Sequence, residues 1–279
     1  MGRNFRFILI AILITGLVSF KIPVARAGFL FPLKSKSPHT TPLGKQDVRI
    51  GVTHNNGERL LFQKVDRNRK LTQLPSTHLA IGLSRNVEIL LEYSLLYLKQ
   101  KGENSKFGSG DLKITGVYQF LKEGVLLPLG SFNFGVKVPN ADDIHGFGTD
   151  ESDVFFGGFF SKRSGDFNFI LNADFALLGN PLPTDSEQDD VFRYSIAGIY
   201  PLKEDIQALI ELEGIEFSHF GNNRRFLRGG FTFSFNRFKF DIGGAAGLND
   251  GSGNYQIQAG ITLMLGKAEK TSYCPCSPQ

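Results

Sequence analysis

The fold of this chain is decided by the stretch DFNFILNADFAL, which occupies residues 166–177. Its odd-numbered positions are all apolar: Phe167, Phe169, Leu171, Ala173, Phe175 and Leu177. Most of its even-numbered positions are polar: Asp166, Asn168, Asn172 and Asp174. A period of two places these two sets on opposite faces of a β-strand. The stretch therefore predicts a strand with one apolar face and one polar face.

Eleven stretches of this kind, each about ten residues long, lie between Thr77 and Leu265. Short turns and long polar loops connect them alternately. Nearly every stretch has an apolar face, and none is polar enough to form the covering layer of a water-soluble sandwich. A closed barrel with lipid outside and polar side chains inside accounts for all of them. We therefore predict an all-β fold, a single transmembrane antiparallel up-and-down β-barrel.

The loop lengths also predict the number of strands. The eleven strands are expected at 77–84, 86–98, 111–120, 125–138, 153–162, 166–177, 191–200, 205–216, 226–235, 237–247 and 255–265. The strand at 77–84 ends in a short turn, so another strand has to precede it, within Val48–Val65, followed by a long first loop at 66–76. The predicted total is twelve strands. Fourteen is the alternative, if Val48–His54 pairs separately.

The N-terminus predicts an exported protein. Arg3 and Arg6 precede an apolar run from Phe7 to Phe20, and residues 25–27 (Ala-Arg-Ala) resemble a cleavage site. We expect residues 1–27 to be a signal peptide cleaved after Ala27, because the apolar run is shorter than the roughly 20 residues of a membrane-spanning helix. The predicted division continues with a flexible N-terminal arm or plug at 28–47, the barrel at 48–265 and a C-terminal tail at 266–279.

Most of the net positive charge of the chain lies in this predicted signal peptide, the leader. The whole sequence carries +4, and the leader contains four basic residues and no acidic ones, so the mature chain is close to neutral. We therefore expect no nucleic acid partner. The expected partners are outer-membrane lipid and lipopolysaccharide, the barrel-assembly machinery and a small organic solute. The oligomeric state is left open, and the predicted location is the bacterial outer membrane.

The apolar positions of each stretch are expected to face lipid. Examples are Val87, Ile89 and Leu91, then Phe132 and Phe134, then Phe231, Phe233 and Phe235. The opposite positions are expected to line the pore: Glu88, Glu92, Asp111, Lys113, Lys137, Asp166, Asn168, Asn172, Asp174, Arg193, Glu211, Glu213, Arg228, Arg237, Lys239 and Asp241. Most of these charges are expected to pair with one another. Leu90, Leu96, Phe155 and Phe159 share the inward positions and would suit a moderately apolar solute, unless Gly157 and Gly158 form a bulge that reverses the pattern.

Several short segments resemble one known family. They are His78–Leu83 leading into Val87–Leu91, Gly108–Leu112 with Tyr118, Gly135–Asn140, Gly146–Thr149, and the closing strand Gly260–Leu265. In this order they resemble the outer-membrane family named for the MetA pathway of phenol degradation. The resemblance implies an outer-membrane barrel that passes aromatic or similar small compounds. One departure is the 14 residues after Leu265, since barrel chains usually end at an aromatic residue of the last strand.

Three other features of the sequence are candidate sources of chemistry. Ser218 and His219 are the one adjacent pair suited to a lipid hydrolase, although neighbours on a strand point to opposite faces. Two acidic loops, at 142–153 and 185–190, suit Ca²⁺ or lipopolysaccharide-bound cations, but solvated loops are the simpler interpretation. Cys274 and Cys276 offer too few ligands for structural zinc. We expect no catalytic residues, no metal and no cofactor.

The predicted function is that of a porin-like channel for the passive passage of small organic, aromatic or hydrophobic solutes, and not of an enzyme. Two alternatives stay open at this point. One is an outer-membrane lipid hydrolase, and the other is a non-conducting structural or adhesive barrel.

Overall fold

The computed structural model describes residues 29–57, 69–143, 146–179, 190–217 and 223–266. Within these ranges all regular structure is β. The strands are β1 (Gln46–Asn56), β2 (Arg69–Gly82), β3 (Val87–Gln100), β4 (Lys106–Ser109), β5 (Leu112–Leu121), β6 (Leu129–Val138), β7 (Asp153–Ser164), β8 (Phe167–Leu177), β9 (Val191–Pro201), β10 (Ile206–Phe217), β11 (Arg224–Phe235), β12 (Phe238–Gly247) and β13 (Tyr255–Leu265). No helix in the described residues is long and apolar enough to cross a membrane.

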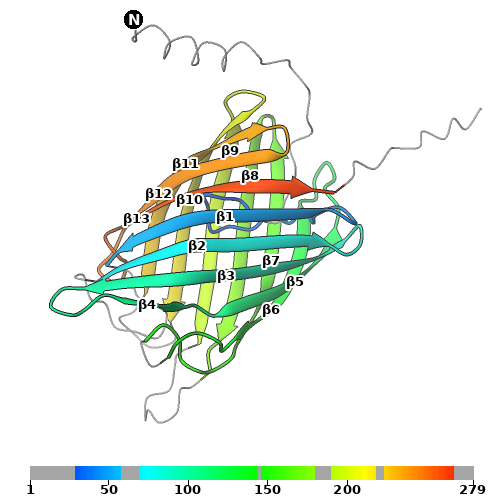
Figure 1. Cartoon of the computed structure of the whole chain (residues 1–279). Helices are drawn as coiled ribbons and strands as arrows, with labels where there is room; N and C mark the ends of the chain where they lie inside the picture. Colours follow the sequence, from blue (N-terminus) through cyan, green and yellow to red (C-terminus); the bar gives the residue numbers. More distant parts are fainter. Residues whose placement is uncertain (1–28, 58–68, 144–145, 180–189, 218–222, 267–279) are drawn as a thin grey trace, which may run out of the picture.

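The strands form one closed antiparallel sheet (Figure 1). Each strand pairs with its neighbours in the sequence, except that β4 and β5 both pair with β3 and not with each other, and β1 closes the ring by pairing with both β2 and β13. Gln46 lies opposite Leu265 at one end of this seam, and Asn56 lies opposite Tyr255 at the other. Closure leaves no unpaired sheet edge along the seam, as a lipid environment requires. The predicted barrel is confirmed.

The barrel has twelve membrane-crossing strands because β4 and β5 together make one crossing. β3 pairs with β4 through Leu95–Leu98 and with β5 through Val87–Glu92. Between them the backbone N–H of Gly110 donates to the carbonyl oxygen of Ser94 at 2.9 Å. The predicted count of twelve is therefore correct, and the alternative of fourteen is not. β4 lies between the strands predicted at 86–98 and 111–120, where the sequence predicted no strand.

The sequence placed the first two strands incorrectly. β1 ends at Asn56 and not near Val65, and β2 begins at Arg69, inside the loop predicted at 66–76. Proline at position 75 hid this part of β2, because it cannot donate to the ladder and breaks the alternation. The structure accommodates it at an irregularity in the pairing with β3, between Gln73 and Ser76.

Two smaller differences occur in β6 and β7. The strand predicted at 125–138 begins at Leu129, and residues 122–128 form the connection that precedes it. Gly157 and Gly158 pair in register with both neighbouring strands, so the pattern does not reverse at this point.

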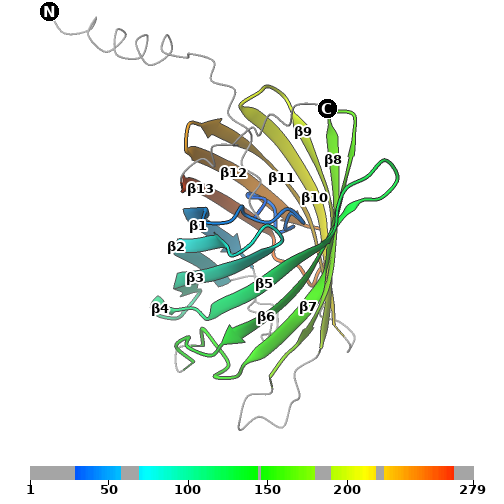
Figure 2. The same cartoon turned by 90° about the vertical axis from the view of Figure 1, so that its right-hand side faces the viewer.

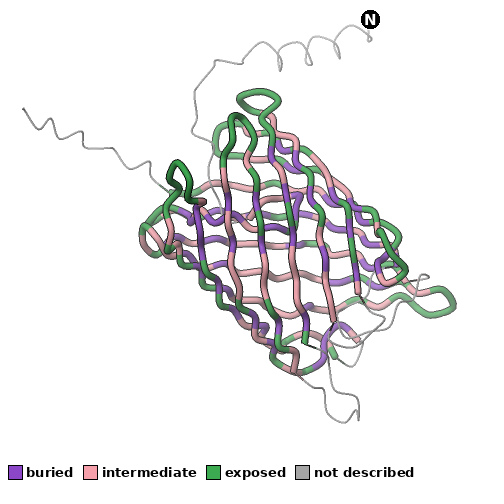
Figure 3. The backbone as a smooth tube through the Cα atoms, turned by 180° about the vertical axis from the view of Figure 1, so that it is seen from behind, coloured by how far each residue is buried: buried purple, intermediate pink, exposed green. Residues whose placement is uncertain are grey.

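The predicted lipid face lies on the outside of the barrel. Large apolar side chains at outward positions, including Phe132, Phe134, Ile210, Phe231 and Ile261, are exposed. Their neighbours along each strand are mostly buried, so exposed and buried residues alternate along many of the strands (Figure 3). Short connections join the strands at the end of the barrel where β1 begins and β13 ends, which is the periplasmic end in barrels of this type.

Candidate functional site

Residues 29–45, called the inner segment below, lie inside the ring of strands (Figures 1 and 2). The segment first makes a tight loop, in which Phe29 bridges to Lys36 and the backbone N–H of Leu33 donates to the carbonyl oxygen of Leu30 at 2.8 Å. It then leads directly into β1. Because it contains no strand of its own, its backbone polar groups have to bind side chains of the barrel wall.

One side of the inner segment is bound by Glu211 of β10. The carboxylate accepts hydrogen bonds from the backbone N–H of Lys34 at 3.1 Å and of Ser35 at 2.6 Å, and from the Ser35 hydroxyl. The same hydroxyl lies 2.7 Å from the hydroxyl of Ser195 on β9. Hydrogen bonds to a charged acceptor are stronger than those between neutral groups. Glu211 therefore acts as an anchor for the loop.

Further contacts come from β8, two strands away from β10 on the same wall, and from β3 on the opposite wall. Asn172 accepts from the Lys36 backbone N–H at 2.6 Å and donates its amide to the Lys36 carbonyl oxygen at 3.0 Å. The Lys36 ammonium group forms an ion pair with Glu92 at 3.0 Å. Farther along, the backbone N–H of Thr41 donates to Glu88 at 2.7 Å. The inner segment is thus fastened to the walls on both sides of the lumen.

Apolar contacts complete this attachment. Leu33 is buried against Ile170, Ala197, Ile199 and Leu209, which belong to β8, β9 and β10. Phe29 packs on a second cluster from the opposite wall, formed by Ala80, Leu90, Val117 and Phe159. The two clusters bridge the lumen at the level of the loop.

Two glycines in the wall make room for the loop. A Cβ atom at Gly230 would lie 2.5 Å from Cγ of Pro32, and one at Gly243 would lie 2.6 Å from the same atom. Real Cβ atoms do not approach so closely. Glycine at these two positions of β11 and β12 is what allows Pro32 to rest against the wall.

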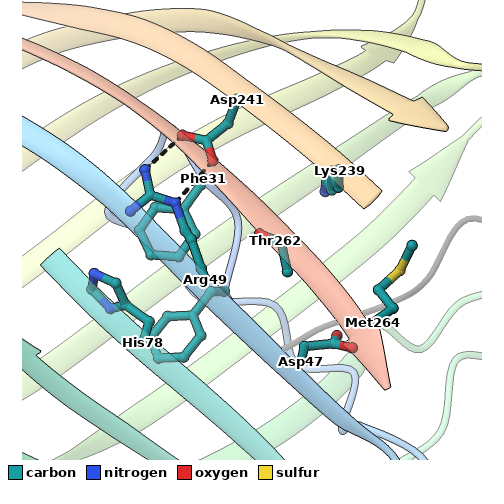
Figure 4. Close-up of a pocket in the computed structure, with 9 residues that line it drawn as sticks. Phe31, Asp47, Arg49, His78, Lys239, Asp241, Thr262 and Met264 are labelled. Atoms are coloured by element: carbon teal, nitrogen blue, oxygen red, sulfur yellow. Dashed lines mark hydrogen bonds and ion pairs between the residues drawn. The ribbon is translucent and has the colours of Figure 1, made fainter. Parts of the chain in front are cut away.

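Arg49 of β1 joins the inner segment to the seam of the barrel (Figure 4). Its guanidinium group donates to Asp241 of β12 from Nε at 2.8 Å and from Nη2 at 2.7 Å. It also lies 3.7 Å from the ring centre of Phe31, and the rings of Phe31 and His78 are 4.6 Å apart. Together with Asp47, Lys239 and Met264 these residues enclose a cavity of about 20 Å³, roughly the size of one water site.

Other charges of the wall form pairs as the sequence predicted. Arg228 binds Glu211 at 3.1 Å and Glu213 at 2.9 Å. Arg193 binds Asp174 on the neighbouring strand. These pairs neutralise charge that would otherwise be isolated inside the barrel.

A further network lies near the outer end. Lys137 binds Asp153 at 2.9 Å and lies 3.6 Å from Asp111. Asp111 also accepts from the backbone N–H groups of Asn140 and Ala141 at 3.2 and 3.0 Å. It therefore holds the loop that follows β6.

That loop enters the outer mouth of the barrel. Phe147 is buried against Leu71, Leu96 and Leu98. Gly108 of β4 permits this approach, because a Cβ atom there would lie 2.7 Å from the Phe147 ring. The outer mouth is thus lined by apolar side chains, above the charged level at Glu92.

The structure places fourteen of the sixteen predicted pore-lining residues on the inward positions of strands or, for Asp111, at the junction of β4 and β5. Lys113 lies opposite Glu92 in the pairing of β3 with β5, Lys239 borders the cavity beside Arg49, and Asn168 lies opposite Ile199. Asp166 and Arg237 are exposed and lie in the turns before β8 and β12. Those two predictions are wrong because a turn at the rim has no inward face.

Sequence reasoning missed Arg49 and the side chains of the inner segment. The signal for Arg49 was present, because Asp47, Arg49, Thr53 and Asn55 alternate with less polar positions along β1. The inner segment has no such period, so its contacts had no local signal. By sequence Asp153 belongs to the acidic loop at 142–153, but in the structure it begins β7 and pairs with Lys137.

The other candidates for chemistry lie largely outside the described residues. These are Ser218, His219, Cys274, Cys276 and most of the acidic loop at 185–190. Within the described ranges, no three His, Cys, Asp or Glu side chains are grouped so that they could hold a metal ion.

A family model described as "Putative MetA-pathway of phenol degradation" matches residues 40–265. The chain belongs to this family. The match spans the end of the inner segment and all thirteen strands. A search of curated proteins found no match.

Two solved structures are similar in fold. An outer membrane channel from Pseudomonas putida F1 has a TM-score of 0.64 at 14% identity, over 81% of this chain and 97% of that one. The porin NanC has a TM-score of 0.50 at 11% identity, over 79% of this chain and 100% of that one. Both likenesses concern the fold of an outer-membrane barrel.

Proposed function

We propose that the protein is an outer-membrane channel through which small organic solutes pass passively. One observation carries this proposal: the lumen is occupied by a segment that is fastened to the walls by side chains and not by strand pairing. Hydrogen bonds between neutral groups, such as those of Asn172 to Lys36, are individually modest and can be exchanged for water or solute. The barrel itself does not have to open for the segment to shift. Membership of the phenol-degradation family and the likeness to an outer-membrane channel agree with this function.

The side chains along β3 suggest the solute class. From the outer end inward, the lumen-facing positions are Leu98, Leu96, Ser94, Glu92, Leu90 and Glu88. Apolar and polar levels therefore alternate along the path. A small molecule with an apolar ring and one hydrogen-bonding group matches both kinds of level, whereas a sugar matches only the polar ones. We infer that phenol-like molecules are preferred.

A non-conducting structural barrel is the second candidate, and the same inner segment favours it, because Leu33 and Phe29 bridge the lumen. Within the described residues no observation favours the enzyme alternative, whose pair Ser218 and His219 lies outside them. Conductance distinguishes the channel from the structural barrel.

The experiment compares the purified protein with a variant that begins at Pro42, each in planar lipid bilayers. This truncation removes the loop but keeps the contacts by which Gly44 and Lys45 bind the backbone of Gly82. We expect small currents from the full protein, interrupted by added phenol and not by glucose, and currents several-fold larger from the truncated one. A full protein that passes no current under any condition, beside a conducting truncated variant, would support the structural barrel. If the truncated variant is folded and also passes no current, the lumen does not conduct ions or solutes and the proposed channel function is wrong.

A further inference from the structure

The connection between β5 and β6 has an unusual apolar tip. Val125, Leu126 and Leu127 follow one another there and are 94%, 90% and 56% exposed. The corresponding turn between β9 and β10 contains Lys203, Glu204 and Asp205. Exposing three consecutive large apolar side chains to water is unfavourable, so this tip points to a partner.

The tip has a defined conformation. The backbone N–H of Gly124 donates to the carbonyl oxygen of Leu127 at 3.0 Å. The Lys162 ammonium group donates to the carbonyl oxygens of Val125 at 2.9 Å and Leu127 at 3.2 Å, and also to that of Gly124. Glu123 lies 4.0 Å from the same ammonium group and accepts from the backbone N–H of Arg163 at 2.9 Å. The polar groups of the turn are thus largely satisfied internally, and its apolar side chains are presented outward.

The turn lies on the lipid side of the wall. Lys162 shares the outward positions of β7 with Phe156 and Phe160. The Phe160 ring meets Phe120 edge-on at 6.3 Å, and Phe120 and Tyr118 are exposed on β5, on the far side of β6 from β7. In Figure 2 the connection between β5 and β6 projects away from the barrel wall. The apolar tip therefore continues the lipid-facing surface beyond the ends of the strands.

We propose that residues 124–127 insert into the periplasmic leaflet of the outer membrane and that their partner is phospholipid. Backbone carbonyls that enter an apolar layer need internal donors, and Lys162 supplies three such bonds. A lysine at the edge of the hydrocarbon layer normally extends to the headgroups. Here it instead caps the turn, and Glu123 balances its charge. The insertion anchors one side of the barrel at a fixed depth, and it holds whether or not solutes cross the lumen.

The test places an environment-sensitive fluorophore at the tip. In a background with Cys274→Ser and Cys276→Ser, Leu126→Cys is labelled with a nitrobenzoxadiazole dye and the protein is reconstituted into phosphatidylcholine vesicles. Lys203→Cys in the β9–β10 turn, at the same end of the barrel, is the matched control. Leu126 is 90% exposed, so its replacement leaves the folded barrel intact.

We expect the dye at position 126 to emit at shorter wavelength than the dye at position 203. Nitroxide-labelled acyl chains should quench it at least about twofold more strongly, and aqueous iodide should quench it less. Adding Lys162→Ala should move the emission at position 126 toward that of the control, because the carbonyls lose their donor. If both positions emit alike and iodide reaches both equally, the tip lies in water and the proposal is wrong.

Discussion

Arg49 and Asp241 form a bidentate ion pair across β13, with donor–acceptor distances of 2.8 and 2.7 Å and side chains only 2% and 1% exposed. Arg49 belongs to the first strand and Asp241 to the second-last, so the pair spans the seam at which the barrel closes. The same guanidinium group stacks on Phe31. One side chain therefore contributes both to closure of the barrel and to attachment of the inner segment.

Asp241→Ala should destabilise the barrel by about 3 kcal/mol, because it leaves a buried guanidinium group without its acid. Unfolding in urea, followed by circular dichroism in detergent, measures the loss. Arg49→Lys should cost less but should still weaken the barrel, since an ammonium group cannot form the two parallel bonds. The double variant Arg49→Met with Asp241→Leu should recover most of the stability. The proposed role of the pair would be contradicted if Asp241→Ala had the stability of the wild type and the double variant were no more stable than Asp241→Ala.

Glu211→Gln should loosen the inner segment without opening the barrel. The carboxylate accepts from two backbone N–H groups of the segment, and an amide accepts more weakly. We expect amide hydrogen exchange in residues 33–36 to accelerate about tenfold, which corresponds to roughly 1.4 kcal/mol. Mass spectrometry of peptic fragments provides the measurement.

Glu213→Gln is the control for this experiment, because Glu213 binds the same Arg228 at 2.9 Å on the wall. In the Glu213→Gln variant, the rate of amide hydrogen exchange in residues 33–36 should stay near that of the wild type. Equal acceleration in both variants would mean that the charge of the wall, and not the bond to Ser35, holds the segment.

Gly243→Ala should displace Pro32, since the added methyl group would lie 2.6 Å from its ring. The expected result is faster cleavage of the inner segment by an added protease, with the β-content unchanged. The same methyl group also approaches the carbonyl oxygen of Gly229 at 2.6 Å, so the double variant Gly243→Ala with Pro32→Gly tests which of the two contacts causes the effect. If the inner segment of the double variant resists the protease as well as that of the wild type, the clash with the proline ring is the cause.

The outward-facing Gly229→Ala serves as the matched control. The nearest atom to its new methyl group is the carbonyl oxygen of Leu209, at an ordinary 3.5 Å. The protease should then cleave the inner segment of Gly229→Ala at the same rate as that of the wild type. A similar increase in both variants would point to a general loosening of β11 and β12.

Leu171→Arg should cost roughly 2–4 kcal/mol of folding free energy in lipid, because Leu171 faces outward at the middle of β8. Phe169→Arg should cost less, about 0–1 kcal/mol if it reaches the headgroups, since Phe169 lies opposite Lys162 nearer the turn. Refolding into vesicles over a range of urea concentrations measures both. Equal costs at the two positions would be inconsistent with this depth assignment.

Much of the barrel could be predicted because its signal is local. Each strand from β7 to β13 shows the period of two within about ten residues, and Glu211, Glu213 and Arg228 could be assigned to the interior from that period alone. The prediction failed where the period is interrupted. Pro75 hid the first half of β2, and Gly110 with Asp111 separated β4 from the strand that it continues.

The sequence by itself determined the closed barrel, its twelve crossings and which side chains face lipid, since alternation along a strand and loop length are properties of neighbouring residues. Only the tertiary structure decided what occupies the lumen. The inner segment has no period, and its partners are distant in sequence: Glu88 is 47 residues from Thr41, and Gln258 is 226 residues from Pro32. Contacts of that range exist only once the ring has closed.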